Sequence, residues 1–516
     1  MTPEQKCRIA VDFHARGNLA EAERLYAEIL GHEPNNFLTR HMLGLVRYQQ
    51  GRIPEALNLI GSALKLNPHD AAALSNYGLV LEAMGRFEEA LAFYGKAIAE
   101  NPGFAEAYSN RGDTLQALER FPEAVASYGQ AIERKPDHAE AWNNRGSALL
   151  RLGRLNEALA DYGKATALRP RFADAWCNRG KALHALGRFD EALAAFDKAI
   201  EQRPDYADAR LNKSLVELLL GKFDSGWRNY EGRKETFVPP AKGKFPPLLT
   251  SRADAPGKTI LVHGEQGLGD TIQFFRYVGM LRDAGARVLF APQKQLIRLL
   301  RSAGDGYELV DLDERSLSFD HHVPLMSLPL LFGTVLENIP AKVPYLFAED
   351  GPVQKWRDRL GGHGFKIGIC WKGKSTYPHD ASRSLALAHF EKLSRLPHVR
   401  LISLHKGEGE GELNALPDRM IVERLGDDFD ADAFVDTAAV MKCLDLVVTS
   451  DTSIPHLAGA LGVPVWVALS HVPDWRWLLD RADSPWYPTM RLFRQPARGD
   501  WTSVFSGIAT ELARII

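Results

Sequence analysis

Prolines recur at a fixed interval through the first half of this chain. They stand 34 residues apart, at Pro34, Pro68, Pro102, Pro136, Pro170 and Pro204. Two columns of small residues keep the same step: Gly44, Gly78, Gly112, Gly146 and Gly180, and Ala22, Ala56, Ala90, Ala124, Ala158 and Ala192. A period of this length indicates a supersecondary unit that buries its apolar face only by stacking on neighbouring copies. The period therefore predicts a solenoid.

A large residue follows at the same interval, at Tyr26, Ile60, Tyr94, Tyr128, Tyr162, Phe196 and Tyr230. Small Gly and Ala let two antiparallel helices approach closely, the large residue fills the gap between them, and proline closes each unit. These columns resemble the tetratricopeptide repeat. The resemblance implies an α-solenoid over residues 1–236, with six repeats over about 3–206 and a degenerate seventh over about 207–236. Ser214 and Gly226 alter the small positions of the seventh unit, which we expect to be a cap.

A column of asparagines keeps the same period without being needed for helix packing: Asn76, Asn110, Asn144, Asn178 and Asn212. The column falls on the first helix of each unit, which lines the concave face in this fold. Asparagines there would hydrogen-bond the backbone of an extended peptide without reading its sequence. The arrangement resembles the repeat region of O-linked N-acetylglucosamine transferases, which grips protein substrates. We therefore expect an acceptor protein to bind this face, although simple tolerance of Asn on an exposed helix stays open.

The composition excludes several function classes. A net charge of −2 supplies no large basic field for nucleic acid or a membrane surface. Four cysteines lie far apart and form no CxxC pair, so neither a zinc site nor a disulfide framework is expected. The first residues read as a polar amphipathic helix, and no apolar run approaches the length of a membrane span. The expectation is a soluble, cytoplasmic protein without a metal cofactor, whose oligomeric state is open.

The second half changes character after a Pro-rich linker at 237–258, which we expect to be short and stiff. Apolar runs then alternate with amphipathic stretches, which predicts parallel sheets. We expect two α/β lobes, at 259–350 and 351–516, and one helix from Asp270 to Gly285. The expected strands are 259–264, 287–292, 307–312, 321–326, 366–371, 399–405, 420–426, 444–450, 464–470 and 490–495.

Residues 444–470 hold the most informative pattern of this half. A buried run ends at Ser450, a polar loop follows, and a short helix has Pro455 in its first turn and Gly462 just past its end. A loop that ends a parallel strand and opens a helix presents free N–H groups to an anion such as a diphosphate. Because any α/β protein contains such turns, a purely structural role stays open.

Four motifs carry a second resemblance: EQGLGDTIQFFRYV, CWKGKSTYPHDASRS, DTSIPHLAGALGVPVWVALS and PDWRWLLDRADSPWYPTMRLFRQ. Residues 259–516 resemble the heptosyltransferase family of inverting glycosyltransferases with the GT-B fold. The whole chain is similar to bacterial proteins that join tetratricopeptide repeats to such a domain, some of which glycosylate flagellin. The resemblance implies two Rossmann-like lobes and metal-independent transfer of a sugar from a nucleotide-sugar donor, held by the second lobe, to a protein hydroxyl such as a flagellin Ser or Thr.

The resemblance assigns the catalytic base to Asp270, which matches the Gly-Asp motif of the family. Such a transfer needs a base for the acceptor hydroxyl and stabilisation of the departing diphosphate. Asp270 should open a helix after a strand, so a capping role stays open beside the catalytic one. Glu265 is the reserve candidate. The remaining residues expected at the cleft are Gln266, Gly267, Gly269, Gln273 and Arg276.

A basic loop after the first strand of the second lobe supplies the expected phosphate ligands. The family places a cation there, and this chain offers Lys372, Lys374 and Arg383, with Ser384 as a further hydroxyl. An arginine fork suits a phosphate held at two points. The sequence leaves open which cation binds, and a solvated basic loop remains the alternative.

The family's Asp-Thr-Gly turn becomes Asp451, Thr452 and Ser453 in this chain. The resemblance implies that this turn, with His456, contacts the sugar and the phosphates, although Ser453 lacks the close approach of glycine. His405 and Lys406 end a strand where related enzymes bind the nucleobase. The aromatic residues Trp475, Trp477, Trp486 and Tyr487 would either stack on the ligand or pack between the lobes.

Two other functions remain open from the sequence. The repeats would be a scaffold if the second half is a non-catalytic nucleotide-sugar-binding module. Alternatively, the enzyme would act on lipopolysaccharide or another glycan, which the asparagine column disfavours because a glycan offers no repeating peptide backbone.

Overall fold

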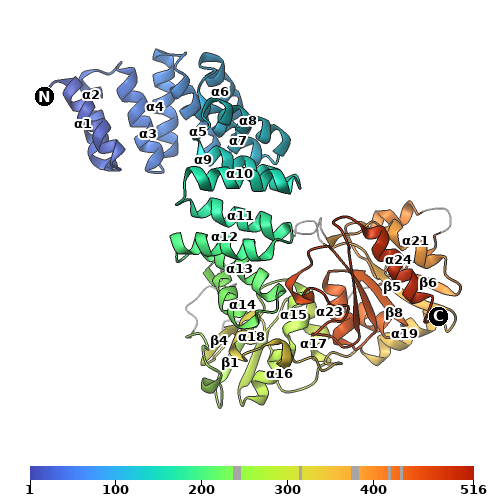
Figure 1. Cartoon of the computed structure of the whole chain (residues 1–516). Helices are drawn as coiled ribbons and strands as arrows, with labels where there is room; N and C mark the ends of the chain where they lie inside the picture. The colour runs from blue at the N-terminus through green and yellow to red at the C-terminus, as the bar shows by residue number, and fades with distance from the viewer. Residues whose placement is uncertain (236–245, 313–316, 374–382, 417–419, 430–433) are drawn as a thin grey trace. The chain divides into compact units, whose positions relative to one another are not determined.

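The computed structural model describes residues 1–235, 246–312, 317–373, 383–416, 420–429 and 434–516 (Figure 1). The chain divides into two compact units, Met1–Asp205 and Tyr206–Ile516. The first is entirely helical, and the second contains all the strands of the described residues.

Unit 1 is a row of twelve helices that form six antiparallel pairs. The helices are α1 (Pro3–Ala15), α2 (Leu19–His32), α3 (Phe37–Gln49), α4 (Ile53–Leu66), α5 (Ala71–Ala83), α6 (Phe87–Glu100), α7 (Ala105–Ala117), α8 (Phe121–Arg134), α9 (Ala139–Arg151), α10 (Leu155–Leu168), α11 (Ala173–Ala185) and α12 (Phe189–Gln202). The predicted α-solenoid is thus confirmed, with one helix pair for each of the six repeats.

The glycine column explains how each helix pair closes. A Cβ atom at Gly112 would lie 2.5 Å from Cε1 of Tyr128, and one at Gly146 would lie 2.8 Å from Cε1 of Tyr162. Both tyrosine side chains are fully buried. Any side chain at the glycine would collide with the ring, because interiors are close-packed. The helices therefore approach as the sequence predicted, with the ring filling the gap.

The first helices of neighbouring repeats lie closer together than the second helices do. Direct contacts join α3 to α5, α5 to α7, α7 to α9 and α9 to α11. Closer spacing on this side curves the stack, and the first helices therefore line its inner face. The asparagines at 76, 110, 144 and 178 lie on these helices.

Unit 2 begins with the degenerate seventh repeat, which is built into the α/β part. It comprises α13 (Ala207–Leu219), α14 (Phe223–Tyr230) and η1 (Glu231–Glu235). The indole of Trp227 donates to the carbonyl of Thr334 at 3.0 Å and packs edge-on against Phe274 and Trp475. This helix pair therefore shares its core with the sheets that follow.

The first sheet contains four parallel strands in the order β3-β2-β1-β4. Its elements are η2 (Arg252–Asp254), β1 (Thr259–His263), α15 (Leu268–Phe274), α16 (Arg276–Asp283), β2 (Arg287–Ala291), η3 (Lys294–Leu296), α17 (Ile297–Arg301), β3 (Glu308–Leu309), β4 (His321–Pro324), η4 (Leu325–Ser327), α18 (Leu328–Leu331) and η5 (Leu336–Asn338).

The second sheet contains six parallel strands in the order β10-β9-β8-β5-β6-β7. Its elements are α19 (Asp350–Leu360), β5 (Phe365–Cys370), η6 (Leu387–Phe390), α21 (Glu391–Ser394), β6 (Val399–Ser403), η7 (Glu410–Asn414), β7 (Val422–Glu423), α22 (Val435–Met441), β8 (Leu446–Ser450), α23 (Ser453–Ala460), β9 (Val465–Leu469), η8 (Trp475–Trp477), β10 (Met490–Arg494) and α24 (Trp501–Leu512).

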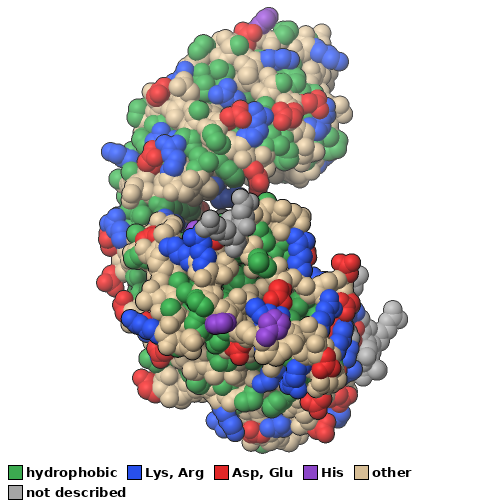
Figure 2. Space-filling model, turned by 90° about the vertical axis from the view of Figure 1, so that its right-hand side faces the viewer, with side chains coloured by type: hydrophobic (Ala, Val, Ile, Leu, Met, Phe, Trp, Pro, Cys, Tyr) green, Lys and Arg blue, Asp and Glu red, His purple; other side chains and the backbone are tan. Residues whose placement is uncertain are grey.

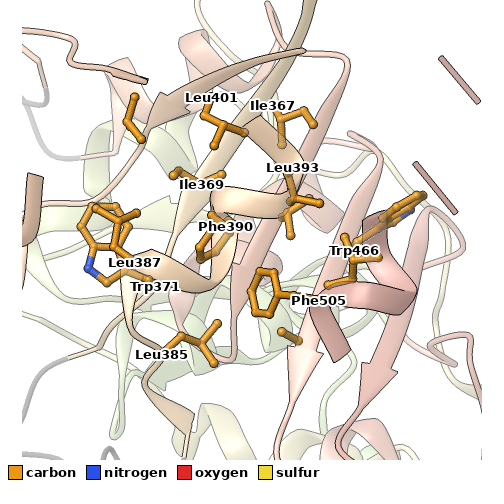
Figure 3. Packing of buried hydrophobic residues seen from close by; sticks show 14 of the residues in the cluster. Ile367, Ile369, Trp371, Leu385, Leu387, Phe390, Leu393, Leu401, Trp466 and Phe505 are labelled. Atoms are coloured by element: carbon orange, nitrogen blue, oxygen red, sulfur yellow. The ribbon is translucent and has the colours of Figure 1, made fainter. Parts of the chain in front are cut away.

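One face of the second sheet carries a large apolar core (Figure 3). Ile367 and Leu401, from neighbouring strands, pack with Phe505 of α24, and all three are buried. Strands β8 and β9 are buried along their whole length, as expected for parallel strands covered on both faces. This core holds the carboxyl ends of β5 and β8 in fixed positions.

Both sheets have the strand order of a doubly wound fold. Numbered within its own sheet, the second reads 3-2-1-4-5-6, and the first reads 3-2-1-4. In such sheets ligands bind beyond the carboxyl ends of the strands, where the order reverses. That point lies between β1 and β4 in the first sheet and between β5 and β8 in the second. The prediction of parallel α/β sheets is confirmed.

One local expectation differs from the structure. The helix expected from Asp270 to Gly285 begins at Leu268 and is interrupted at the single residue Phe275, which separates α15 from α16 and keeps helical backbone angles. The described part of the linker is attached to the first sheet: Leu249 donates its N–H to the carbonyl of His322 in β4 at 2.9 Å.

Candidate functional site

Helix α15, which follows β1, packs against helix α23, which follows β8 (Figure 1). A Cβ atom at Gly269 would lie 3.0 Å from Cδ2 of His456 and 3.3 Å from Cα of Ser453. Glycine at 269 therefore lets the first turns of the two helices touch. This contact brings Asp270, from the first lobe, next to the turn 451–453 of the second, so one site contains both sets of predicted residues.

Both oxygens of the Asp270 carboxylate are engaged. Oδ2 accepts the backbone N–H of Gly267 at 2.7 Å, and Oδ1 pairs with the guanidinium of Arg476. Burial raises the pKa of Asp270, and the nearby Arg476 opposes that rise. The carboxylate thus caps its own helix, as the structural alternative held, and also pairs with the buried guanidinium of Arg476 while remaining partly exposed itself.

Arg476 connects the two lobes at this point. It lies in η8, in the loop between β9 and β10, and its side chain is 8% exposed. Its Nε donates to Oε1 of Gln273 at 2.7 Å, and its Nη1 donates to Oδ1 of Asp474 at 2.9 Å. The guanidinium also stacks on the Trp475 ring at 4.3 Å. Stacking and three hydrogen bonds fix the plane of this cation.

Asp451 follows β8 and lies close to the same charges. Burial is the main cause that raises the pKa of Asp451 to about 7, and repulsion from Asp474 is the second. Arg383, Arg476 and the indole of Trp477 favour its ionised form, although the Trp477 N–H makes no hydrogen bond of ordinary geometry with a described residue. Asp451 is therefore a carboxylate whose charge changes near neutral pH.

The first turn of α23 is held from two sides. Thr452 caps it by accepting the N–H of Ile454 at 3.3 Å, and Ser453 follows as the first helical residue. Nδ1 of His456 lies 3.1 Å from the Tyr487 hydroxyl, and its ring stacks on Trp477 at 5.3 Å. Burial and the nearby Arg476 hold the pKa of His456 well below its ordinary value. His456 is thus a buried, neutral imidazole.

The cations predicted after β5 have different surroundings. Lys372 forms an ion pair with Glu412, whose carboxylate also accepts the N–H of Leu387 at 2.9 Å. The charge of Arg383 opposes the rise in the pKa of both Asp270 and Asp451, so Arg383 lies near these two carboxylates. Ser384, beside it, is half-buried. Lys374 lies outside the described residues. Of the described pair, Arg383 is the cation that the structure brings to the carboxylates.

His405 and Lys406 are not among the residues that meet Asp270. His405 is buried, stacks on Trp371 at 4.1 Å, and lies 2.6 Å from the carbonyl of Glu408 through Nε2. Burial lowers its pKa. Lys406 is exposed, with Nζ 5.8 Å from the Phe429 ring centre. These contacts give His405 a packing role at the end of β6.

Glu265 and Gln266 are held by the seventh repeat. The side chain of Glu265 is 1% exposed and pairs with Arg233 through both oxygens, at 2.7 and 3.1 Å. The Tyr230 hydroxyl donates to Oε1 of Gln266 at 3.0 Å. These bonds order the loop that leads from β1 to Gly267 and Asp270. The reserve candidate for the base is therefore fully occupied by an ion pair in this structure.

Gln273 and Arg276 are buried rather than directed into open space. The Nε2 atom of Gln273 has no hydrogen-bond partner among the described residues. Arg276 donates to the carbonyls of Pro340 and Trp486 at 2.6 and 2.9 Å, so it joins the lobes structurally. Trp475, Trp477, Trp486 and Tyr487 are all buried, which favours the packing interpretation of that aromatic segment.

The asparagines of unit 1 join successive repeats. One amide N–H of each donates to the preceding repeat: Asn110 to Oγ of Ser75 at 3.3 Å, Asn144 to Oδ1 of Asp113 at 2.9 Å and Asn178 to Oδ1 of Asn143 at 3.0 Å. Nδ2 of Asn76 similarly lies 2.9 Å from Nε2 of His41. All four are half-buried, so part of each amide remains at the surface.

Asn212 differs from the rest of the column, because it lies in unit 2 and donates within its own helix to Asp208 at 2.7 and 2.9 Å. It therefore does not continue the inter-repeat pattern. The predicted column is structurally uniform only over the four rungs of unit 1.

The sequence analysis missed Arg476, Asp474 and Arg233 as site residues. The signal for the first two was the run Asp-Trp-Arg-Trp after a buried strand, where charges amid aromatics must be paired if buried. Arg233 gave no such signal, because it stands at the end of a repeat-like helix pair.

Three further features of the described part of the chain concern surface charge, membrane-spanning helices and metal sites. On the face shown in Figure 2, acidic and basic side chains are interspersed. Within those same residues no helix is long and apolar enough to cross a membrane, and no group of three or more His, Cys, Asp or Glu side chains is placed to hold a metal ion.

Models of the tetratricopeptide repeat match residues 41–103, 109–170 and 173–206. The chain is also similar to protein FlbA of Caulobacter vibrioides, with 27% identity over 312 residues. That match covers 56% of this chain and 52% of FlbA, so the chain spans about half the length of this curated relative. Residues 41–206 therefore form tetratricopeptide repeats, a type of repeat that suggests a protein-binding scaffold.

Solved structures of repeat proteins resemble part of this chain. A tetratricopeptide repeat protein from Parabacteroides merdae has 21% identity and a TM-score of 0.37, covering 45% of this chain and 92% of its own. YrrB, a TPR protein described as having an unusual peptide-binding site, has 25% identity and a TM-score of 0.31, covering 37% and 98%.

Proposed function

We propose that this protein is an inverting, metal-independent glycosyltransferase of the GT-B type, which moves a sugar from a nucleotide-sugar donor to a protein hydroxyl. The repeats bind the acceptor protein. The carrying observation is that Asp270, beyond β1, lies beside the turn Asp451–Ser453, beyond β8, in two doubly wound sheets. In such sheets ligands bind beyond the carboxyl ends of the strands, and these residues lie beyond those ends.

The reaction follows from these groups. The acceptor oxygen forms a bond to the anomeric carbon while the bond from that carbon to the diphosphate oxygen breaks. The hydroxyl proton passes to the Asp270 carboxylate, and the electron pair leaves with the nucleoside diphosphate. Arg383 and the backbone N–H of Ser453, at the start of α23, stabilise the charge on the leaving group, and Asp451 holds sugar hydroxyls. Cationic side chains and backbone amides meet the electrostatic demand without a metal ion.

The acceptor half of the proposal rests on the repeats. A tetratricopeptide array is a protein-binding scaffold, and its inner face carries four half-buried asparagines in register. Amides in a row suit the backbone of an extended segment. The resemblance to flagellin-modifying proteins makes a flagellin Ser or Thr the first acceptor to test.

A thermal-shift screen of the full chain against nucleotides and nucleotide sugars tests the donor site. A ligand at about 100 times its dissociation constant should stabilise the protein by about 2.7 kcal/mol. Asp451→Ala and Arg383→Ala should abolish the shift. Arg287→Ala is the matched control. Arg287 is the first residue of β2, at the amino end of the strand and away from the carboxyl ends that carry the site, and its ion pair with Glu308 is exposed. No shift with any nucleotide would favour a non-catalytic scaffold.

Transfer itself needs a second measurement. With a donor that binds, the wild type should release the nucleoside diphosphate and add one sugar mass to an acceptor protein, and Asp270→Asn should lose the transfer. Binding and nucleotide release in the presence of lipopolysaccharide, without modification of any protein, would instead support the glycan-modifying alternative.

A further inference from the structure

The guanidinium of Arg476 has more N–H groups than its described hydrogen bonds use. The guanidinium has five N–H groups, and its described bonds use one each to Gln273, Asp474 and Asp270. Two N–H groups, one on each terminal nitrogen, therefore have no described acceptor. A buried donor without an acceptor costs roughly 1–3 kcal/mol, so such a cluster is suited to a ligand rich in oxygen atoms.

One neighbour of Arg476 has the same unmet need. Nε2 of Gln273 lacks a hydrogen-bond partner among the described residues, and its side chain is fully buried. Gln273 contacts Arg476 directly, because its Oε1 accepts the N–H of Nε. Arg476 and Gln273 thus both carry donors that the described residues leave unused.

Two carboxylates already neutralise the charge of Arg476, so a phosphate would have to compete with them for the guanidinium. It is bound on one side by Asp270 and on the other by Asp474. An anion that approaches its remaining N–H groups must share the guanidinium with Asp270. Because a cation shared between two anions binds each more weakly than either alone, phosphate binding and the Asp270 ion pair oppose each other.

We propose that Arg476 is a shared cation that holds Asp270 masked until the diphosphate of the donor binds, and that this binding loosens the ion pair and frees the carboxylate to accept the acceptor proton. The inference rests on the proposed function, which it deepens. It assigns Arg476 as a ligand of the donor phosphates and as the positioning residue of Asp270. The base is thereby active only when the donor is in place.

The test is titration calorimetry of the full chain with UDP, GDP, ADP and dTDP, with the matching nucleosides as controls. Asp270→Asn should bind a nucleoside diphosphate about fivefold or more tightly than the wild type, at the lower end of usual couplings between two sites. The amide keeps the cap to Gly267 but removes the charge that competes for Arg476. Nucleoside affinity should not change, because a nucleoside has no phosphate.

Arg476 variants complete the cycle. Arg476→Gln should weaken diphosphate binding by about tenfold or more, and Arg476→Lys should restore part of it, since lysine keeps the charge without the planar fork. In the double variant Asp270→Asn with Arg476→Gln, which removes both charges of the pair and so limits misfolding, the tightening caused by Asp270→Asn should vanish. A merely structural ion pair would not produce tighter binding in any variant.

The outcomes separate the inference from the proposed function. If the wild type binds a diphosphate and Asp270→Asn binds it equally or more weakly, the masking inference is wrong while the donor site stands. If only Asp270→Asn binds, masking is supported in its strongest form. If neither the wild type nor any variant binds a diphosphate, the donor site and the inference fall together. If Asp270→Asn binds more tightly but the wild type transfers no sugar, the competition for Arg476 stands, and the role of Asp270 as the base falls together with the catalytic proposal.

Discussion

The repeat array and the α/β unit hold their structures together in different ways. In unit 1 one contact is copied along the chain: glycine against tyrosine in α7 and α8 recurs in α9 and α10, one period later. In unit 2 the contacts that form the site occur once and join distant residues. Asp270 and Arg476 are 206 positions apart, and Arg233 and Glu265 belong to different supersecondary elements.

This difference predicts how each unit responds to mutation. A copied contact can be lost at one repeat while its neighbours keep their own interfaces, because a solenoid is held by nearest-neighbour terms. A single-copy buried ion pair has no such substitute. The two units are therefore best compared through substitutions that are chemically alike but differ in how often the contact occurs.

The largest effect is expected for Arg233→Ala. It leaves Glu265, with a side chain 1% exposed, as a buried carboxylate without its cation, which should cost about 3–5 kcal/mol. Chemical denaturation of the full chain should show the loss in the transition of unit 2. Arg298→Ala is the control, because its pair with Glu349 is exposed on both sides and its removal should leave stability unchanged. Equal stability of the two variants would mean that the seventh repeat does not support the α/β core.

The contrast between copied and single contacts also explains what the sequence could predict. The α-solenoid followed from the spacing of Gly, Ala and Pro alone, because each column position keeps one environment. The parallel sheets followed from β-branched runs such as those of β8 and β9. The one-residue interruption at Phe275 did not, since a continuous amphipathic pattern runs through it.

The candidate site was predictable only in its short-range parts. Asp270 and the turn at Asp451 each stand at a strand-to-helix junction, which local pattern identifies. That Gly269 would touch Ser453, and that Arg476 would reach Asp270, depends on how two lobes pack, for which no local signal exists. The basic loop was identified as a whole, but the pairing of Lys372 with Glu412 distinguishes it from Arg383 only in three dimensions.

A second test sets one substitution in two environments of the repeats. Gly112→Ala would place a Cβ atom 2.5 Å from the Tyr128 ring and should destabilise unit 1 by about 1–3 kcal/mol. Gly95→Ala, on α6, meets nothing within 4 Å and should instead stabilise its helix by about 0.5–1 kcal/mol. Thermal melts of the two variants should shift in opposite directions. A shift of the same sign would show that glycine in the column is not there for close packing.

The pH dependence of stability tests the single-copy cluster. Burial raises the pKa of Asp451 to about 7, above its ordinary value of about 3.9, so the folded state keeps a proton that the unfolded state loses. The resulting stability is present below about pH 4 and is lost as pH rises toward 7. For one proton the slope is at most about 1.4 kcal/mol per pH unit.

Asp451→Asn isolates that contribution, because the amide cannot ionise. Denaturant midpoints measured at pH 5, 6, 7 and 8 should show the wild type losing stability relative to Asp451→Asn between pH 5 and 7, with a constant difference above that range. A difference independent of pH throughout would mean that Asp451 is ionised in the folded protein at all these values.

The smallest effect, and the one that bears on the acceptor, is expected in the asparagine column. Asn110→Ala removes one hydrogen bond to Ser75 and should cost about 1 kcal/mol. Because three other rungs remain in unit 1, binding of an acceptor peptide should weaken moderately in this variant and further in Asn110→Ala with Asn178→Ala, roughly as the product of the two effects. Retention of peptides from an unbiased array by the full chain measures this. Asn58→Ala, an exposed position on the second helix α4, is the matched control and should retain peptides like the wild type. If the control and the column variants behave alike, the asparagines only fasten one repeat to the next, and acceptor proteins must be recognised by another surface.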